Sequence, residues 1–253
     1  MARNNSSEFS IFFDDGGVMN DNKLRGIQWQ KMIGDFFSPK YGGESHKWSE
    51  ANFEFINEIM AEYTKAAENE ELIEYNDYYS DFILRWVTSM FDYVGVEVPP
   101  EEMHNKIYFE VIEAITPNTK TSFPGVVEAI KNLHNQGFRL FTASGEHSVE
   151  LKGYLRGMRV KDCFENFYGP DLINTHKSNE VFYDRIFKQI NLDPRRAIVI
   201  DDKPIFLEFA EKIRANVVQA CLTGEFEPSY RYYVEHMNEL PEVITKLLKK
   251  MKK

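Results

Sequence analysis

The segment FSIFFDDGGVMND, residues 9–21, places two neighbouring aspartates, Asp14 and Asp15, directly after an apolar run and before two glycines. A carboxylate can act as a nucleophile toward phosphorus, and carboxylates also hold the divalent cations that neutralise phosphoryl oxygens. The doublet therefore indicates nucleophilic or metal-binding chemistry. It leaves open which aspartate reacts.

Further polar groups with matching chemistry occur later in the chain. Ser144 ends the segment FRLFTAS, Lys177 lies in THKSNEVFYDRIF, and Asp201 and Asp202 end the segment AIVIDD. A hydroxyl and a lysine can bind phosphoryl oxygens and stabilise the charge of a transition state. Together with Asp14, these groups predict a phosphoryl-transfer site.

The elements around these residues follow an alternating pattern. The apolar run from Phe9 to Phe13 is typical of a buried parallel strand. After residue 119, amphipathic helical stretches alternate with four further candidate strands, FRLFTAS, CFENFYG, RAIVIDD and NVVQACL. Such alternation predicts an α/β fold with a parallel sheet flanked by helices. Because ligands bind at the carboxyl ends of such strands, the polar groups are expected to meet at one edge of the sheet.

Residues 22–118 have a different spacing of apolar residues. In stretches such as ANFEFINEIMAEYTKAAENEELIEY, apolar residues recur at helical spacing. This pattern predicts an all-helical insert of four to six helices after the first strand. Residues 1–21 and 119–253 then form the α/β core. SPKYGGESHKW, with its paired glycines, is expected to form a mobile loop. The tryptophans all fall in the insert, where they are expected to form its core: Trp29, Trp48 and Trp86.

Charge and composition restrict the classes of partner. The 253-residue chain has a net charge of −10, which disfavours binding to nucleic acid or to an anionic membrane and favours a small phosphorylated molecule. Between residues 20 and 118, 19 acidic and 8 basic side chains carry about −11, so the rest carries about +1. This asymmetry also points to two structural units. A monomer or small homo-oligomer is expected.

Cysteine use and hydropathy bear on the compartment. Cys163 and Cys221 are far apart and match no disulfide or metal-ligand spacing. The segment MARNNSSEFS lacks an apolar signal core, and no run approaches the ~18 apolar residues that a membrane span requires. These features predict a cytoplasmic protein with reduced thiols.

The motifs and their order resemble the haloacid dehalogenase-like (HAD) superfamily over most of the chain. Its first motif is an apolar strand, a nucleophilic Asp, any residue, usually a second Asp, then Gly and Thr or Val. FFDDGGV matches with Asp14 as nucleophile, Asp15 as the variable residue, and Gly17 and Val18 closing the motif. If Asp15 were the nucleophile, Val18 would stand where the glycine belongs, so Asp14 fits better.

The later motifs match in the same way. Ser144 matches the second motif, with Thr142 as a weaker alternative, and Lys177 matches the third. The acidic pair of the fourth motif ends 25 residues after Lys177. The resemblance implies a Rossmann-like core with a helical C1 cap, and catalysis by Asp14, Ser144 and Lys177. It also implies substrate binding by Ser144, Gly145 and Lys177.

The same resemblance implies a Mg²⁺ site. Its ligands would be Asp14, the backbone carbonyl of Gly16 and Asp202, with Asp201 in support. Oxygen ligands of this kind suit Mg²⁺.

Gly16 departs from the pattern of the family's phosphatases, whose second Asp protonates the leaving group and then activates water. Loss of general acid–base catalysis typically costs ~10²–10⁴-fold in rate. We expect a Mg²⁺-dependent hydrolase of a small phosphorylated metabolite, acting through an aspartyl-phosphate on Asp14 with impaired or substituted acid–base catalysis. The alternatives are a non-catalytic or weakly active metal- and phosphate-binding relative, and a phosphonatase-like enzyme. Candidate substitutes for the acid in the insert are Arg25, Glu44, His46 and Lys47.

Overall fold

The computed structural model describes residues 8–69, 72 and 74–251. Within that part, the chain divides into two compact units. The first contains the residues up to Asn22 and those from Thr121 onward, and the second runs from Lys23 to Lys120. Each unit is described by itself below.

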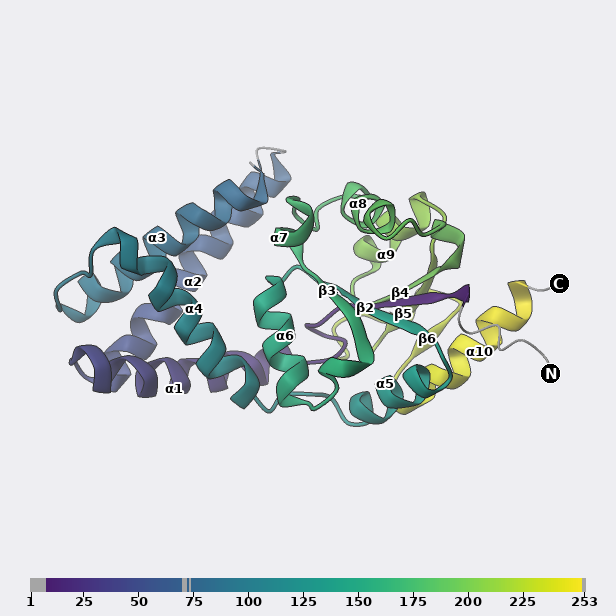
Figure 1. Cartoon of the computed structure of the whole chain (residues 1–253), viewed down its shortest axis with the longest axis horizontal. Coiled ribbons are helices and arrows are strands. Elements are labelled where there is room, and N and C mark those ends of the chain that lie inside the picture. Colours follow the sequence, from purple (N-terminus) through teal and green to yellow (C-terminus); the bar gives the residue numbers. More distant parts are fainter. Residues whose placement is uncertain (1–7, 70–71, 73, 252–253) are drawn as a thin grey trace. The chain divides into compact units, whose positions relative to one another are not determined.

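The first unit is built on a parallel sheet with the strand order β3-β2-β1-β4-β5-β6 in the described residues (Figure 1). Its strands are β1 (Ser10–Phe13), β2 (Arg139–Ala143), β3 (Phe164–Tyr168), β4 (Ala197–Asp201), β5 (Asn216–Ala220) and β6 (Tyr233–Val234). The predicted α/β fold with a parallel sheet is confirmed. The sequence did not predict β6, because two residues are too few to show a strand period.

Helices cover both faces of this sheet (Figure 1). Ile11 and Phe13 of β1 pack with residues of α5 (Val126–Asn135) and α10 (Leu240–Met251). Phe12 points to the opposite face, as alternation along a strand requires, and packs with residues of α8 (Val181–Gln189) and α9 (Pro204–Lys212). The central strand is therefore apolar on both faces, which explains its continuous hydrophobic run.

Shorter elements complete the first unit. They are α6 (Ser148–Gly157), α7 (Pro170–Ile173) and the 3-10 turns η4 (Lys161–Cys163), η5 (Pro194–Arg196) and η6 (Met237–Glu239).

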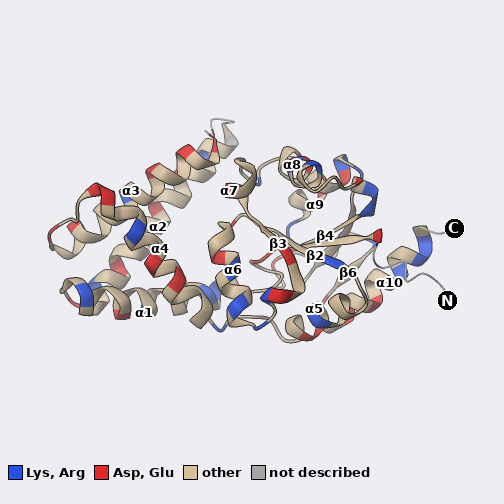
Figure 2. Cartoon of the chain, viewed as in Figure 1, with Lys and Arg blue, Asp and Glu red and all other residues tan. Residues whose placement is uncertain are grey.

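The second unit is helical. It contains α1 (Asn22–Tyr41, whose first residue belongs to the first unit), α2 (Ser45–Glu68), α3 (Tyr75–Val94) and α4 (His104–Ile115), with the 3-10 turns η2 (Glu101–Met103) and η3 (Thr116–Asn118). Trp48 and Trp86 are buried, as expected, and their indole nitrogens donate to Gly42 O (2.8 Å) and Asn52 Oδ1 (2.9 Å). Trp29 is only half-buried. Acidic side chains are frequent along these helices (Figure 2).

The expected loop at SPKYGGESHKW is replaced by a tight connection between helices. α1 continues to Tyr41, and α2 begins at Ser45. Gly42 and Gly43 both have positive φ, and a Cβ at Gly43 would lie 2.4 Å from Val94 Cγ1. The paired glycines therefore allow a sharp turn with close packing rather than a long loop.

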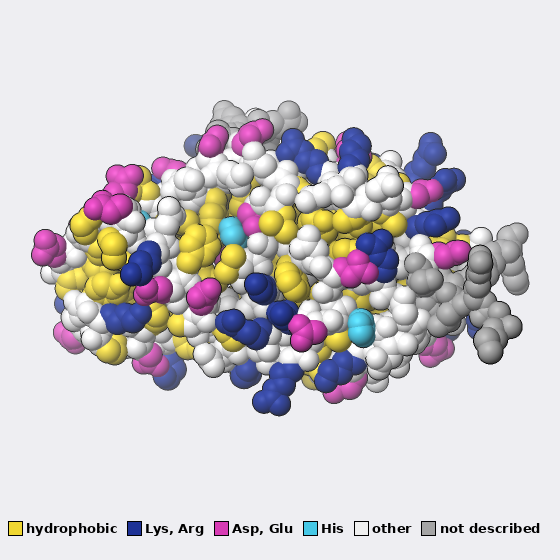
Figure 3. Space-filling view, viewed as in Figure 1, with side chains coloured by type: hydrophobic (Ala, Val, Ile, Leu, Met, Phe, Trp, Pro, Cys, Tyr) yellow, Lys and Arg dark blue, Asp and Glu magenta, His cyan; other side chains and the backbone are white. Residues whose placement is uncertain are grey.

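No helix among the described residues is long and apolar enough to cross a membrane. On the face shown in Figure 3, acidic and basic side chains are interspersed.

Candidate active site

The sheet brings the predicted residues to the carboxyl ends of its central strands. Asp14 directly follows β1, and its backbone N–H continues the ladder by donating to Ile200 O of β4 (2.9 Å). Asp201 is the last residue of β4, and Asp202 follows it. On the other side of β1, Ser144 follows β2, and its N–H donates to Tyr168 O of β3 (3.2 Å). Residues far apart in sequence thus meet at one edge.

The turn after β1 is fixed by Asp15. Its carbonyl accepts from the N–H groups of Met19 and Asn20, both at 2.8 Å. The Asp15 carboxylate is buried and accepts from Asn20 Nδ2 (2.8 Å). Asn20 Oδ1 in turn accepts from Thr121 Oγ1 (2.8 Å). These contacts give Asp15 a structural position within the turn.

Lys177 connects the carboxylates of two strands. Its Nζ donates to Asp14 Oδ1 (2.7 Å), to Asp201 Oδ2 (2.6 Å) and to Ala143 O (2.9 Å). The side chain is buried, with Nζ 4.8 Å from the centre of the Phe206 ring. Burial strengthens these charge-assisted hydrogen bonds and holds Asp14 in a single orientation.

Three of the carboxylates are placed so that they could hold a cation. Asp14, Asp201 and Asp202 each offer an oxygen, and these oxygens lie within 4.8 Å of one another. Asp201 Oδ1 also accepts from Lys203 N (3.0 Å). A Cβ at Gly17 would lie 2.2 Å from Asp202 Oδ2, so glycine is required for this close approach. A buried set of oxygen donors with excess negative charge fits Mg²⁺.

Burial and neighbouring charges shift the pKa values of Asp14, Asp202 and Lys177 from their usual ranges. It raises the pKa of Asp14 to about 7, although Lys177 acts in the opposite direction, and the charges of Asp201 and Glu146 add to the rise. Burial and the charge of Asp14 raise the pKa of Asp202 to about 6. Burial by itself would lower the pKa of Lys177, but Asp14 and Asp201 outweigh it, so that pKa lies well above its usual range. The cluster therefore pairs a permanent cation with carboxylates that bind protons readily.

These raised values predict a pH dependence of stability. Between about pH 4 and pH 7, Asp14 binds more protons in the folded state than in the unfolded state, so its contribution to the free energy of unfolding falls as the pH rises through this window. We expect urea denaturation in the presence of EDTA to show a smaller fall between pH 5 and pH 7.5 for Asp14→Asn than for the wild type. An equal or larger fall in the variant would contradict the assignment.

Ser144 lies next to Asp14 and has an acidic partner. Its Oγ accepts from Asp15 N (3.4 Å) and donates to a carboxylate oxygen of Glu146. The hydroxyl of Thr142, the weaker alternative, donates instead to Tyr168 O of the neighbouring strand β3 (3.2 Å). Gly145 is exposed. Glu146 was not predicted from the sequence, where its only signal is an acidic residue directly after Ser-Gly at a strand end.

The space beside Gly16 is filled by another side chain. A Cβ at Gly16 would lie 2.4 Å from Asn22 Oδ1 and 2.7 Å from Asn22 Nδ2. The Asn22 carboxamide thus occupies the place into which a side chain at residue 16 would extend. The residue without a carboxylate is therefore in close contact with the Asn22 side chain.

The candidate substitutes for that carboxylate lie in the second unit: Arg25, Glu44, His46 and Lys47. His46 Nδ1 lies 3.5 Å from Glu44 Oε2, and both side chains are exposed. Their proposed role stays a prediction.

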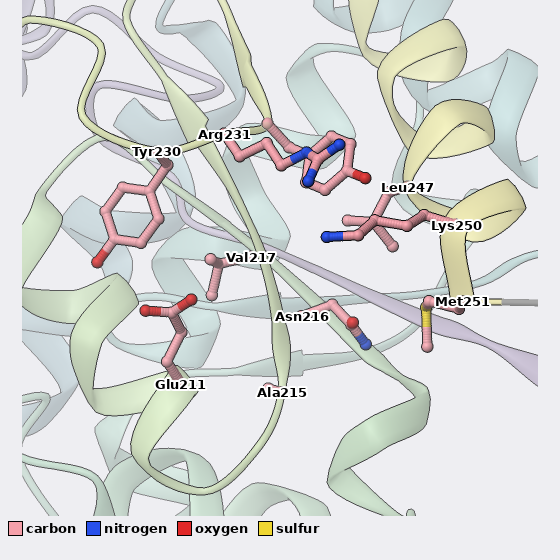
Figure 4. Close-up of a pocket in the computed structure, with 10 residues that line it drawn as sticks. Glu211, Ala215, Asn216, Val217, Tyr230, Arg231, Leu247, Lys250 and Met251 are labelled. Atoms are coloured by element: carbon pink, nitrogen blue, oxygen red, sulfur yellow. The ribbon is translucent and has the colours of Figure 1, made fainter. Parts of the chain in front are cut away.

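A pocket of about 350 Å³ lies elsewhere in the first unit (Figure 4). It lies beside Asn216, the first residue of β5, and is lined in part by Tyr230, Arg231 and Lys250. Because the carboxylate cluster lies at the carboxyl ends of the strands, this pocket belongs to a different part of the sheet.

The fold and site define a Rossmann-like α/β protein with an acidic cluster at the carboxyl edge of its sheet. Residues 47–220, more than half of the chain, match the model of the haloacid dehalogenase-like hydrolase family. The chain belongs to this family, as the sequence motifs predicted.

Solved structures of the family share this fold. A 2-haloacid dehalogenase from Pseudomonas syringae is 14% identical with a TM-score of 0.65, covering 94% of this chain and 99% of that one. A HAD phosphatase from Thermococcus onnurineus is 15% identical with a TM-score of 0.61, covering 93% and 97%. The HAD-hydrolase YfnB from Bacillus subtilis, solved with magnesium, is 13% identical with a TM-score of 0.59, covering 93% and 98%. No curated protein matches the sequence.

Proposed function

We propose that the protein is a Mg²⁺-dependent phosphohydrolase of a small phosphorylated metabolite, with Asp14 as the nucleophile. The observation that carries this proposal is the buried hydrogen bond from Lys177 to Asp14 beside Asp201 and Asp202. A nucleophile needs a fixed orientation, and a phosphoryl group needs nearby positive charge. The fold shared with a HAD phosphatase supports the proposal.

The reaction would proceed in two displacements. Lys177 holds Asp14 Oδ1, so Oδ2 is the oxygen that attacks phosphorus. The bond between phosphorus and the ester oxygen breaks, and the leaving oxygen takes a proton from solvent. Water then attacks phosphorus, the aspartyl-phosphate bond breaks, and inorganic phosphate leaves with the Asp14 carboxylate restored. The Ser144 hydroxyl and the Gly145 N–H would bind the phosphoryl oxygens.

The cation would be held by Asp14, Asp202 and the carbonyl of Gly16, with Asp201 orienting the cluster. When bound, Mg²⁺ supplies positive charge that neutralises the phosphoryl oxygens. The helical second unit would act as the substrate-selecting cap. Its acidity favours a substrate whose non-phosphate part is neutral or cationic.

Removal of one ligand is expected to remove most of the stabilisation by Mg²⁺. A ligand at a hundredfold excess over its Kd stabilises the folded state by about 2.7 kcal/mol, so Mg²⁺ should raise the wild-type Tm. Asp202→Asn should lose most of this rise. The matched control is Asp162→Asn, whose side chain is 94% exposed. Thermal unfolding with and without Mg²⁺ measures the effect, and an undiminished rise in Asp202→Asn would exclude Asp202 as a ligand.

A second candidate function is non-catalytic binding of phosphate and metal. Gly16 favours it, because glycine supplies no acid–base group at this position and the Asn22 side chain lies against it. A panel of aryl and alkyl phosphates, assayed with and without Mg²⁺, separates the two functions. Mg²⁺-dependent multiple turnover supports the hydrolase, whereas binding without turnover supports the non-catalytic relative.

A further inference from the structure

The pocket beside β5 results from the short length of the neighbouring strand. β6 pairs only with Gln219 and Ala220, so in the described chain the first half of β5 has no partner strand at this edge of the sheet. Leu247 and Lys250 of α10 also line the pocket, which has a volume of about 350 Å³. A cavity of this size can enclose a small ligand.

A buried glutamine holds the segment that leads into β6. Gln219 Oε1 accepts from the backbone N–H groups of Ser229 (2.8 Å) and Tyr230 (3.3 Å), and its Nε2 donates to Glu227 O (3.1 Å). Tyr230 and Arg231 therefore line the pocket from a fixed backbone. Such preorganisation lowers the conformational cost of binding a ligand.

Tyr230 provides an aromatic surface in the pocket, with the Glu211 carboxylate beside it (Figure 4). The ring is half-buried, and its hydroxyl donates to Pro204 O (3.2 Å), so the ring is held in place. Burial and the charges of Glu211 and Glu208 raise the pKa of Tyr230 to about 12, so the phenol stays protonated. A flat ring that carries an N–H donor can stack on Tyr230 and donate to Glu211.

Two cations, Arg231 and Lys250, line another side of the pocket (Figure 4). Both side chains are exposed, and among the ion pairs of the described residues neither has a carboxylate partner. By contrast, Lys246 of the same helix pairs with Glu242 (2.8 Å). The Arg231 guanidinium lies 5.7 Å from the centre of the Tyr232 ring. A guanidinium and an ammonium group together suit a phosphate, which accepts charge-assisted hydrogen bonds from both.

Positive charge thus lies at one end of the pocket, and a carboxylate with an aromatic ring lies at the other, with Val217 between them (Figure 4). We propose that this pocket binds a nucleoside monophosphate whose base carries an exocyclic amine. Arg231 and Lys250 hold the phosphate, and the base stacks on Tyr230 and donates its amine hydrogens to Glu211. Binding here needs no Mg²⁺ and is separate from the proposed hydrolysis at the carboxyl ends of the strands.

The first measurement is calorimetric titration with adenosine monophosphate (AMP) in the presence of EDTA. Adenosine lacks the phosphate and ribose 5-phosphate lacks the base, so each should bind the wild type at least ~10-fold more weakly than AMP. Inosine monophosphate has a carbonyl oxygen in place of the amine and should also bind more weakly. Glu211→Gln should remove this preference, because an amide can pair with either group. No binding of AMP, or equally tight binding of adenosine, would overturn the proposal.

Variants assign the binding to the pocket. Arg231→Ala and Lys250→Ala should each weaken AMP binding by ~10-fold, the loss expected for one charge-assisted hydrogen bond. The matched control is Lys249→Ala, because Lys249 is an exposed lysine of the same helix that lies outside the pocket lining. Lys249→Ala and Asp14→Asn should bind AMP as the wild type does. Loss of binding in Asp14→Asn with full binding in Arg231→Ala would place the nucleotide at the carboxylate cluster and overturn the proposal.

The second measurement locates the nucleotide by methyl NMR of the metal-free protein. Adding AMP should shift the methyl signals of Val217, Leu247 and Met251, which line the pocket. Binding that leaves these three signals unchanged would overturn the proposal. Neither measurement requires turnover, so failure of the proposed hydrolysis would leave both tests intact. Failure of AMP to bind would in turn leave the proposed hydrolase standing.

Discussion

Asp14→Asn is expected to abolish phosphate release from aryl and alkyl phosphates alike. An amide is a far weaker nucleophile than a carboxylate, and loss of a covalent nucleophile in other hydrolases lowers kcat on the order of 10⁴-fold or more. The variant keeps an oxygen that can accept the hydrogen bond from Lys177 Nζ, so the fold of the site should persist. The loss would therefore be chemical.

Phosphate release should be measured at saturating Mg²⁺ with high enzyme concentration, together with circular dichroism to verify folding. Asp162→Asn serves as the control, because its side chain is exposed and pairs only with its neighbour Lys161 in the contacts of the described chain (3.1 Å). It should retain wild-type rates. Turnover by Asp14→Asn within tenfold of the wild type would show that Asp14 is not the nucleophile.

Lys177→Met is expected to destabilise the metal-free protein strongly. Lys177 is the cation that hydrogen-bonds both Asp14 and Asp201, and its removal leaves buried carboxylates without that partner. Breaking a buried ion pair in this way typically costs about 3–5 kcal/mol. The cost should be smaller at pH 5, where protonation neutralises the carboxylates. Mg²⁺ should also offset part of it by supplying positive charge.

Urea denaturation at pH 8 and pH 5, with EDTA or with Mg²⁺, measures these differences. Lys188→Met is the matched control, since that side chain is 75% exposed and forms a surface pair with Asp184. Surface pairs contribute little, so its change should stay below about 1 kcal/mol. A similarly small and pH-independent change for Lys177→Met would contradict the role assigned to the buried cation.

The sheet could be predicted largely from the sequence, because most of its strands are short apolar runs next to a helical pattern. RAIVIDD and NVVQACL are buried along most of their length, as β4 and β5 require. β6 could not be predicted, because Tyr233 and Val234 owe their pairing to β5 rather than to any pattern of their own. The tight connection at Gly42 and Gly43 depends on packing against Val94, a contact distant in sequence.

The candidate site, like the sheet, could be predicted only in part from the sequence. The positions of Asp14 and the Asp201–Asp202 pair follow from strand ends, and the order of the motifs predicted that they would meet. The contacts of Glu146 and Asn22 could not be predicted, because each depends on how a turn directs one side chain. Sequence indicates that residue 16 lacks a carboxylate. Only the structure shows that Asn22 fills the adjacent space and that Glu146 reaches Ser144.

These two contacts change the interpretation of the atypical motif. The first displacement needs Asp14 and positive charge, and both are provided for within the first unit. On the β2 side of the site, Glu146 adds an acidic side chain that accepts a hydrogen bond from Ser144.

The most direct test of the central claim is detection of a phosphoryl group on Asp14. The wild type would be mixed with an activated aryl phosphate and Mg²⁺, quenched in acid and digested, and the peptide containing residue 14 analysed by mass spectrometry. We predict that this peptide carries one phosphoryl group at Asp14, and that Asp14→Asn or EDTA abolishes it. Release of phosphate with the phosphoryl group on another residue, or no phosphorylation and no release at any enzyme concentration, would contradict the account.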